Sequence, residues 1–218
     1  MDFPEFDENL KELIYLGRET VDVEFKGALT WSKNSTNMFI TRAMIAMANN
    51  RDGGVIVIGV KDDSFEPIGL TDTEINSFDY DTIGRFLNNY AQPAIDFTLR
   101  KGKVTQSDGS EKLFVIIQIQ ETTYLPVVST KTVKWDPTAP EVSSNLALRD
   151  GVVYVRSKSP VESRELKGHR EWVDFLNLLM DRRQDELIAK IPWGVFKPEI
   201  QRNNDPDQFT QQLNGLGA

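Results

Sequence analysis

Three stretches decide the fold of this chain: GRETVDVEFKGALTW at residues 17–31, ITRAMIAMANNRDGGVIVIGVKDD at residues 40–63, and EPIG at residues 66–69. From Val21 to Lys26 apolar and polar residues alternate, which predicts a strand with one buried and one solvent-exposed face. Apolar residues at helical spacing predict a helix from Asn37 to Asn50, closed by an Arg-Asp-Gly-Gly turn. The almost uninterrupted β-branched run from Val55 to Val60 predicts a strand buried on both faces. The order strand, helix, strand indicates an α/β fold.

Three carboxylates lie near the junctions of these elements. Glu24 stands on the predicted solvent-exposed face of its strand, beside Lys26. Glu19 lies five residues earlier, so it reaches the same side only from the turn that follows Gly17. Asp62 comes just after the carboxyl end of the buried strand, where binding groups gather in open α/β sheets. We expect Glu19, Glu24 and Asp62 to lie close together on one wall of a cleft.

Several pieces of these stretches resemble, in their order and spacing, the Schlafen-type AlbA-like domain. They are Glu-(four residues)-Glu-Phe-Lys, Ala-Met-Ala-Asn, Gly-Gly-Val-Ile-Val-Ile-Gly-Val-Lys-Asp and Pro-Ile-Gly-Leu, with a weaker match at Tyr154-Val155-Arg156. The resemblance covers roughly residues 8 to 180. It implies an α/β (α+β) fold, a mixed β-sheet with flanking helices, in a domain that binds nucleic acid. We assign this domain to residues 1–190, and a polar tail or the start of a linker to residues 191–218.

The resemblance also implies an activity. In the Schlafen ribonucleases, two glutamates and one aspartate of this region form a metal-dependent site that cuts transfer and ribosomal RNA. The corresponding residues here are Glu19, Glu24 and Asp62, and none of them is replaced. This implies an endoribonuclease, a hydrolase acting on structured RNA such as transfer RNA, with Mg²⁺ or Mn²⁺ as cofactor. Many bacterial relatives, however, are regarded only as DNA-binding or regulatory domains, often joined to an ATPase or winged-helix segment.

The chemistry of the three carboxylates is compatible with this activity. Hard divalent cations prefer oxygen ligands, and a metal ion held by them polarises a phosphoryl oxygen and lowers the pKa of a bound water. Lys26, on the same strand face as Glu24, would neutralise charge that develops on the phosphate. The alternative is that these are solvated residues at strand ends, with Lys26 paired to a neighbour. Spacing alone does not decide between the two, because carboxylates in such surroundings are common outside active sites.

The composition of the chain excludes several classes of protein. The chain has 218 residues, 39% of them hydrophobic, and no cysteine, which excludes disulfides and thiolate metal sites. The N-terminal sequence MDFPEFDENL resembles no secretory signal, and no apolar stretch approaches the ~20 residues of a membrane span. We therefore expect a cytoplasmic protein with no membrane contact. The net charge of −8 opposes binding to a polyanion unless a local basic surface exists.

Five basic residues are candidates for contacts with nucleic acid. Arg149, Arg156 and Lys158 belong to a predicted hairpin, in which residues 145–149 and 152–157 pair around an Asp-Gly turn. Lys101 and Lys103 lie near the tip of another predicted hairpin, formed by residues 95–100 and 113–120. The alternative for all five is ordinary solvated surface charge.

Three further elements complete the predicted domain. Asp7 caps a short helix, and Asp79 or Asp81 starts another. A long amphipathic helix is predicted from His169 to Lys190, with an apolar face toward the core that consists of Trp172, Phe175, Leu176, Leu179 and Met180. Trp31, in the loop after the first strand, is either a core residue or a platform on which a base stacks.

Three function classes remain open from the sequence. The first is a metal-dependent endoribonuclease, with RNA favoured over DNA as the partner. The second is a non-catalytic DNA- or RNA-binding regulatory module, whose acidic residues only shape the fold. The third is a protein-interaction domain, which the acidic charge would suit. Because Schlafen ribonucleases pair two related lobes around a groove and this chain contains one, a homodimer would supply the second half.

Overall fold

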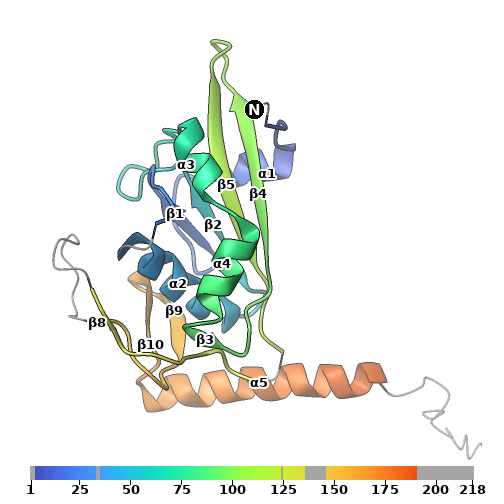
Figure 1. The fold of residues 1–218 in the computed structure, drawn as a ribbon. Coiled ribbons are helices and arrows are strands. Elements are labelled where there is room, and N and C mark those ends of the chain that lie inside the picture. The colour runs from blue at the N-terminus through green and yellow to red at the C-terminus, as the bar shows by residue number, and fades with distance from the viewer. Residues whose placement is uncertain (1–2, 33–34, 124, 136–145, 191–218) are drawn as a thin grey trace, which may run out of the picture. The chain divides into compact units, whose positions relative to one another are not determined.

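The computed structural model describes residues 3–32, 35–123, 125–135 and 146–190 (Figure 1). The chain divides into two units, residues 1–183 and residues 184–218. All the residues whose contacts are discussed below lie in the first unit, and the last helix, α5 (His169–Lys190), continues into the second. The polar tail predicted for residues 191–218 lies outside the described residues.

The predicted strand, helix and strand are present. They are β1 (Val23–Lys26), α2 (Ser35–Ala48) and β2 (Gly54–Ile58), and the two strands pair in parallel with Lys26 opposite Ile58. The predicted long hairpin is also confirmed, because β4 (Phe97–Thr105) pairs antiparallel with β5 (Glu111–Ile119). β5 also pairs antiparallel with β2, so the sheet order is β1-β2-β5-β4. The fold is α+β with a mixed sheet, as expected.

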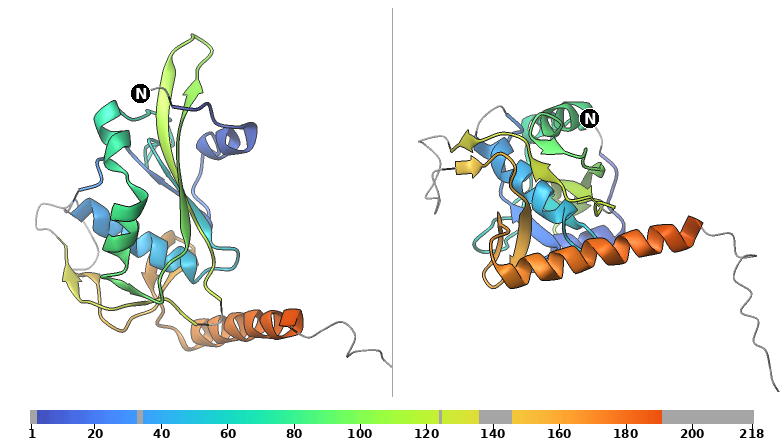
Figure 2. Two further views of the ribbon diagram at one scale, coloured as in Figure 1. Left: turned by 45° about the vertical axis from the view of Figure 1, so that its right-hand side comes forward. Right: turned by 90° about the horizontal axis from the view of Figure 1, so that it is seen from below.

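Both faces of the sheet are covered, which explains the apolar run in β2. Ile56 and Ile58 point into a cluster that includes α2, α3 (Asp72–Ser77) and α4 (Tyr80–Leu87). Val57, between them, points into a second cluster on the opposite face, which includes Ile14 at the end of α1 (Glu8–Ile14). Figure 2 shows α1 on one side of the sheet, with α2, α3 and α4 on the opposite side.

The helix starts follow the predicted chemistry. The Asp7 carboxylate accepts a hydrogen bond from the backbone N–H of Leu10, and Asp79 caps α4 in the same way. Helix α3 was not predicted from the sequence, although Thr71 and Glu74 form a capping box at its start. Trp31 is a core residue, packed against the rings of Phe78 and Phe86.

The predicted pairing of residues 145–149 with residues 152–157 is wrong. The Asp-Gly turn exists, with Gly151 at φ 73°, but the strands around it take other partners. β8 (Leu146–Leu148) pairs with β7 (Val133–Lys134), and β9 (Tyr154–Lys158) pairs with β10 (Val161–Glu165). The remaining short pair joins β3 (Ala91–Gln92) to β6 (Val128–Ser129). Residues 152 and 153 bond to β6 instead, because the backbone N–H of Ser129 donates to the carbonyl oxygen of Val152 and Val153 forms a bridge with Val128.

The last helix, α5 (His169–Lys190), has the predicted bounds but a narrower buried face than expected. Phe175 and Leu179 are buried, in one cluster with Val153 and Leu166. Trp172, Leu176 and Met180 are 37%, 51% and 61% exposed, so the prediction that they face the core is wrong. Within the described residues, no helix is long and apolar enough to cross a membrane.

Candidate functional site

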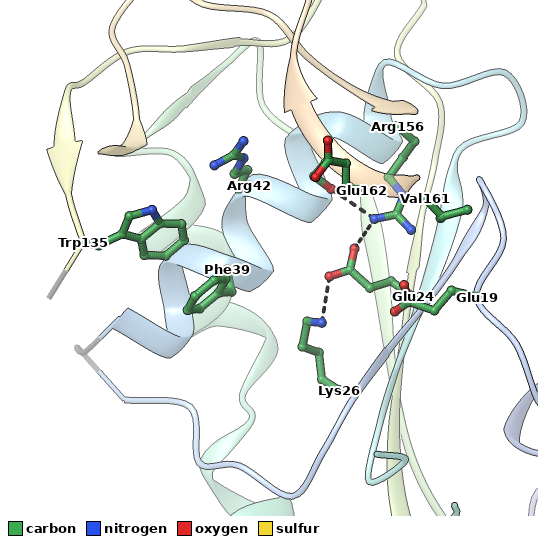
Figure 3. A pocket seen from close by; sticks show the side chains of 10 residues that line it. Glu19, Glu24, Lys26, Phe39, Arg42, Trp135, Arg156, Val161 and Glu162 are labelled. Atoms are coloured by element: carbon green, nitrogen blue, oxygen red, sulfur yellow. Dashed lines mark hydrogen bonds and ion pairs between the residues drawn. The ribbon is translucent and has the colours of Figure 1, made fainter. Parts of the chain in front are cut away.

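Glu24 lies in the interior of the protein, not on a solvent-exposed strand face as predicted. Its exposed fraction is 7%, because the hairpin of β9 and β10 covers this end of β1 (Figure 3). Arg156 of β9 donates to Glu24 Oε2 over 2.5 Å, and Lys26 Nζ lies 3.0 Å from Glu24 Oε1. Both carboxylate oxygens of Glu24 therefore carry a cationic partner, which offsets the cost of burying the charge.

Asp62 joins this group through Lys26. The parallel pairing of β1 and β2 brings the carboxyl ends of both strands to one edge, as the position of Asp62 predicts. Lys26 Nζ lies 2.9 Å from Asp62 Oδ2, and the backbone N–H of Gly27 donates to Asp62 Oδ1 over 2.9 Å. The Asp62 side chain remains 53% exposed, unlike that of Glu24.

Glu19 approaches from the segment before β1, as the position of Gly17 predicts. Its Oε1 accepts the backbone N–H of Phe25 over 3.0 Å. Burial raises the pKa of Glu19 above its usual value; the Phe25 N–H opposes this rise and the negative charge of Glu24 adds to it. Glu19 therefore takes up a proton more readily than an ordinary glutamate does, because its pKa is raised.

Lys26 stays protonated at this position. Burial by itself lowers the pKa of Lys26, but the charges of Glu24 and Asp62 outweigh burial and raise it above the usual value. We refer to Glu19, Glu24, Lys26 and Asp62 as the carboxylate–lysine cluster. Lys26 is its centre, because its ammonium group contacts Glu24 of β1 and Asp62 in the segment that follows β2.

The cluster opens into a pocket of about 240 Å³ (Figure 3). Glu19, Glu24 and Lys26 line it together with Arg156 and the start of β10. The other side consists of Phe39 and Arg42 from α2 and Trp135 from the segment after β7, which we call the aromatic wall. Sequence reasoning missed the aromatic wall. The only signal was a Phe and an Arg one helical turn apart on α2.

A divalent metal ion does not fit the cluster in this arrangement. The three carboxylates supply the right kind of ligand, but both oxygens of Glu24 and both oxygens of Asp62 already accept from protein donors. Lys26 lies between Glu24 and Asp62, where a shared metal ion would need to bind. Among the described residues, no three acidic, histidine or cysteine side chains are grouped so that they hold a metal ion.

The predicted basic surface around β9 is not a continuous row of free cations. Arg156 is buried, and its guanidinium also donates to the carbonyl oxygens of Val21 and Thr20. Arg149 lies 3.3 Å from the Glu165 carboxylate, whereas Lys158 is exposed at the end of β9. Arg156 therefore belongs to the pocket, and Arg149 and Lys158 belong to the surface near it.

Lys101 and Lys103 lie away from the carboxylate–lysine cluster, on β4. Lys101 lines a second pocket of about 380 Å³ beside Phe6 and Asp7. Lys103 forms an ion pair of 2.8 Å with Glu111 on the neighbouring strand. Neither residue is at the tip of the hairpin, which is formed by residues 106–110.

The fold and the pocket define an α+β domain with a partly buried carboxylate–lysine cluster at the carboxyl ends of two parallel strands. The chain belongs to the Schlafen, AlbA_2 family, whose model matches residues 19–163. This match includes all four residues of the cluster and all three of the aromatic wall.

The proteins that are similar to this chain include the following two. One is the uncharacterized ATP-binding protein UU034 of Ureaplasma parvum, 26% identical over 195 residues that make up 86% of this chain and 48% of the relative. The chain thus spans about half the length of that relative. The other is the crystal structure of the DIP2311 protein from Corynebacterium diphtheriae, with 14% identity and a TM-score of 0.44 over 76% of this chain and 30% of that one.

Proposed function

We propose that this domain binds RNA in the pocket and cleaves its phosphodiester backbone at the carboxylate–lysine cluster. The observation that carries the proposal is the position of Lys26. Its protonated amine is held between Glu24 and Asp62 and lies on the wall of an open pocket. A lysine that only stabilises the fold needs no pocket, whereas a lysine that stabilises charge on a reacting phosphate does.

The roles of the cluster follow from its contacts. Lys26 is protonated and oriented by two carboxylates, so it would stabilise negative charge that develops on a phosphate oxygen. Glu19, whose raised pKa favours proton uptake, would accept the proton of the attacking 2′-hydroxyl group. As the new bond to phosphorus forms, the bond from phosphorus to the 5′-oxygen breaks, and the leaving oxygen takes its proton from solvent. Glu24 and Asp62 would position Lys26 rather than contact the substrate.

The acidic net charge does not prevent this binding. The pocket lining is balanced and not net acidic, because three cations, Lys26, Arg42 and Arg156, accompany three glutamates, Glu19, Glu24 and Glu162. Affinity for a polyanion depends on the cations that contact phosphates, and not on the total charge alone.

A non-catalytic nucleic-acid-binding module is the second candidate, and one observation favours it. Arg156 makes four hydrogen bonds, including the one to Glu24, as in an ion pair whose role is to stabilise the fold. In that case the carboxylates would hold β9 against β1, and RNA or DNA would be bound without cleavage.

Incubation of the purified chain with transfer RNA separates the two candidates. We expect cleavage by the wild type, and loss of cleavage without loss of binding in Lys26→Met and Asp62→Asn. Glu12→Gln is the matched control, because Glu12 is exposed on α1 and remote from the pocket. Wild-type protein that binds transfer RNA but leaves it intact would establish the module instead.

Metal dependence is a separate part of the proposal. A divalent ion shared by Glu24 and Asp62 would require Lys26 to leave its present position. We therefore expect Mn²⁺ to bind more tightly to Lys26→Met than to the wild type, measured by calorimetry. Equal affinities would mean that Lys26 does not occupy the place of a metal ion.

A further inference from the structure

The aromatic wall contains a preformed stacking surface. The rings of Phe39 and Trp135 lie 4.0 Å apart between centroids, with 26° between their planes. Phe39 comes from α2, whereas Trp135 comes from the segment after β7. Both line the same pocket as Glu24 and Lys26. Successive flat rings can extend such a stack, and nucleobases stack on aromatic side chains without regard to their sequence.

The same wall holds two buried hydrogen-bond donors that lack an acceptor. Arg42 Nε and Trp135 Nε1 are buried, and neither has a hydrogen-bond partner among the residues that the structure describes. Burying a donor without an acceptor is unfavourable. Arg42 also lines the pocket, and a guanidinium group has only donors, so a ligand that brings acceptors to this wall is favoured over one that brings donors.

Arg42 is held in place without being neutralised. Its guanidinium carbon lies 5.1 Å from the centroid of the Tyr154 ring, a cation–π contact that fixes its orientation. Arg42 forms no ion pair within the described part of the chain. Figure 3 shows Arg42 on the same side of the pocket as Trp135, with Glu24 and Arg156 on the opposite side.

The size of the pocket limits the ligand. Its volume of about 240 Å³ is below the range of about 300–1,000 Å³ that is typical for drug-sized molecules. A single base fits this limit better than a larger ligand does. Lys26 lines the same pocket, so a base on the aromatic wall would place its own phosphate near the carboxylate–lysine cluster.

We propose that Phe39, Arg42 and Trp135 form a subsite for one nucleobase of the bound RNA, with guanine preferred over adenine. The proposed subsite rests on the proposed function, because it specifies which base of the RNA binds in the same pocket. Guanine presents two acceptors, N7 and O6, to the fork of an arginine. Adenine replaces O6 with an amino donor, which would face the donors of Arg42 and leave them unpaired.

The test uses the full chain and two short uridine-rich RNA oligonucleotides that differ at one position, guanosine in one and adenosine in the other. We expect the wild type to bind the guanosine oligonucleotide about tenfold more tightly, the size of one good arginine–guanine contact. Arg42→Gln should bind both equally. Arg85→Gln, an exposed arginine on α4, is the matched control and should keep the preference.

A second pair of variants tests the stacking surface. Trp135→Leu should weaken binding of both oligonucleotides by about tenfold, because each stacked base contributes on that scale. Trp172→Leu, at an exposed position of α5, should not change binding. Thermal unfolding verifies that each variant is folded, and Phe39→Leu replaces Trp135→Leu if the latter is not.

The outcomes separate this inference from the proposed function. Binding and cleavage with equal affinity for guanosine and adenosine would overturn the subsite and leave the function intact. A guanosine preference that Arg42→Gln retains would overturn it as well. A preference that depends on Arg42 in a protein that cleaves nothing would support the subsite and overturn the nuclease. Failure to bind either oligonucleotide would overturn both.

Discussion

At the scale of single residues, Lys26 holds the site together because its ammonium group joins carboxylates from two neighbouring parallel strands. Glu24 and Asp62 contact the same nitrogen at 3.0 and 2.9 Å, but their surroundings differ. Glu24 is buried and also paired with Arg156, whereas Asp62 is about half exposed. The two carboxylates therefore should differ in what they contribute to stability.

We predict that Glu24→Gln lowers the free energy of unfolding by about 3 kcal/mol, because it leaves Arg156 buried with an uncompensated charge. Asp62→Asn should cost less than about 1 kcal/mol, since that ion pair is partly in solvent. Urea denaturation of both variants measures the difference. Equal losses would mean that burial does not distinguish the two carboxylates. The comparison also makes Asp62→Asn the better variant for activity assays.

Glu19 should make stability depend on pH. Because its pKa is raised in the folded protein, its protonated form is favoured by folding. The usual pKa of a glutamate is 4.5. As the pH rises from this value through the raised pKa of Glu19, the wild-type protein should therefore lose stability relative to Glu19→Gln. Denaturation midpoints across this range measure the effect. A difference that grows toward lower pH would contradict the assigned direction.

At the scale of secondary-structure elements, α5 shows that an amphipathic pattern can overstate the buried face. Phe175 and Leu179, one turn apart, make the contact with the domain, and Leu176 is 51% exposed. The apolar contact of the helix is a narrow stripe against the cluster around Val153 and Leu166, and Arg182 adds an ion pair with Glu121.

Two leucines of α5 provide a matched test of this packing. We predict that Leu179→Ala lowers the free energy of unfolding by about 2–3 kcal/mol, since it leaves a cavity in a buried cluster. Leu176→Ala should change it by less than about 0.5 kcal/mol, because the side chain is largely in solvent. Thermal unfolding of both variants would detect the difference, and a larger effect at Leu176 would show that α5 has a partner on its other face.

At the scale of the whole molecule, binding of RNA has to overcome a net charge of −8. Most cations near the pocket are already paired, as Arg149 is with Glu165 and Arg156 is with Glu24. Few of them are available to phosphates, so the affinity for RNA should depend only weakly on salt concentration.

We predict a shallow salt dependence that is reduced further in the double variant Arg149→Gln and Lys158→Gln. For single-stranded RNA, each phosphate that the protein no longer neutralises lowers the slope of log affinity against log salt by about 0.7. Arg51→Gln is the control, since Arg51 is exposed and paired with Asp181 on α5. An unchanged slope in the double variant would show that the phosphates follow another path. Arg156 is left intact because its removal would disturb the fold.

The local sequence pattern was sufficient to predict much of the secondary structure of this protein. The β-branched run of β2, the helical spacing of α2 and the caps at Asp7 and Asp79 are all properties of neighbouring residues, and the structure confirms each one. The position of Asp62 beside Lys26 also follows from sequence, because two parallel strands joined by a helix end at the same edge.

The burial of Glu24 and the contacts between distant segments could be known only from the tertiary structure. Alternation in β1 predicted that Glu24 faces solvent, but a hairpin more than a hundred residues later covers it and supplies Arg156. The pairing of β8 with β7, the narrow face of α5 and the meeting of Trp135 with Phe39 likewise depend on segments far apart in the chain. The physical reason is the same in each case. Local sequence determines which faces of an element are apolar or charged, whereas burial and pairing depend on which distant surface packs against them.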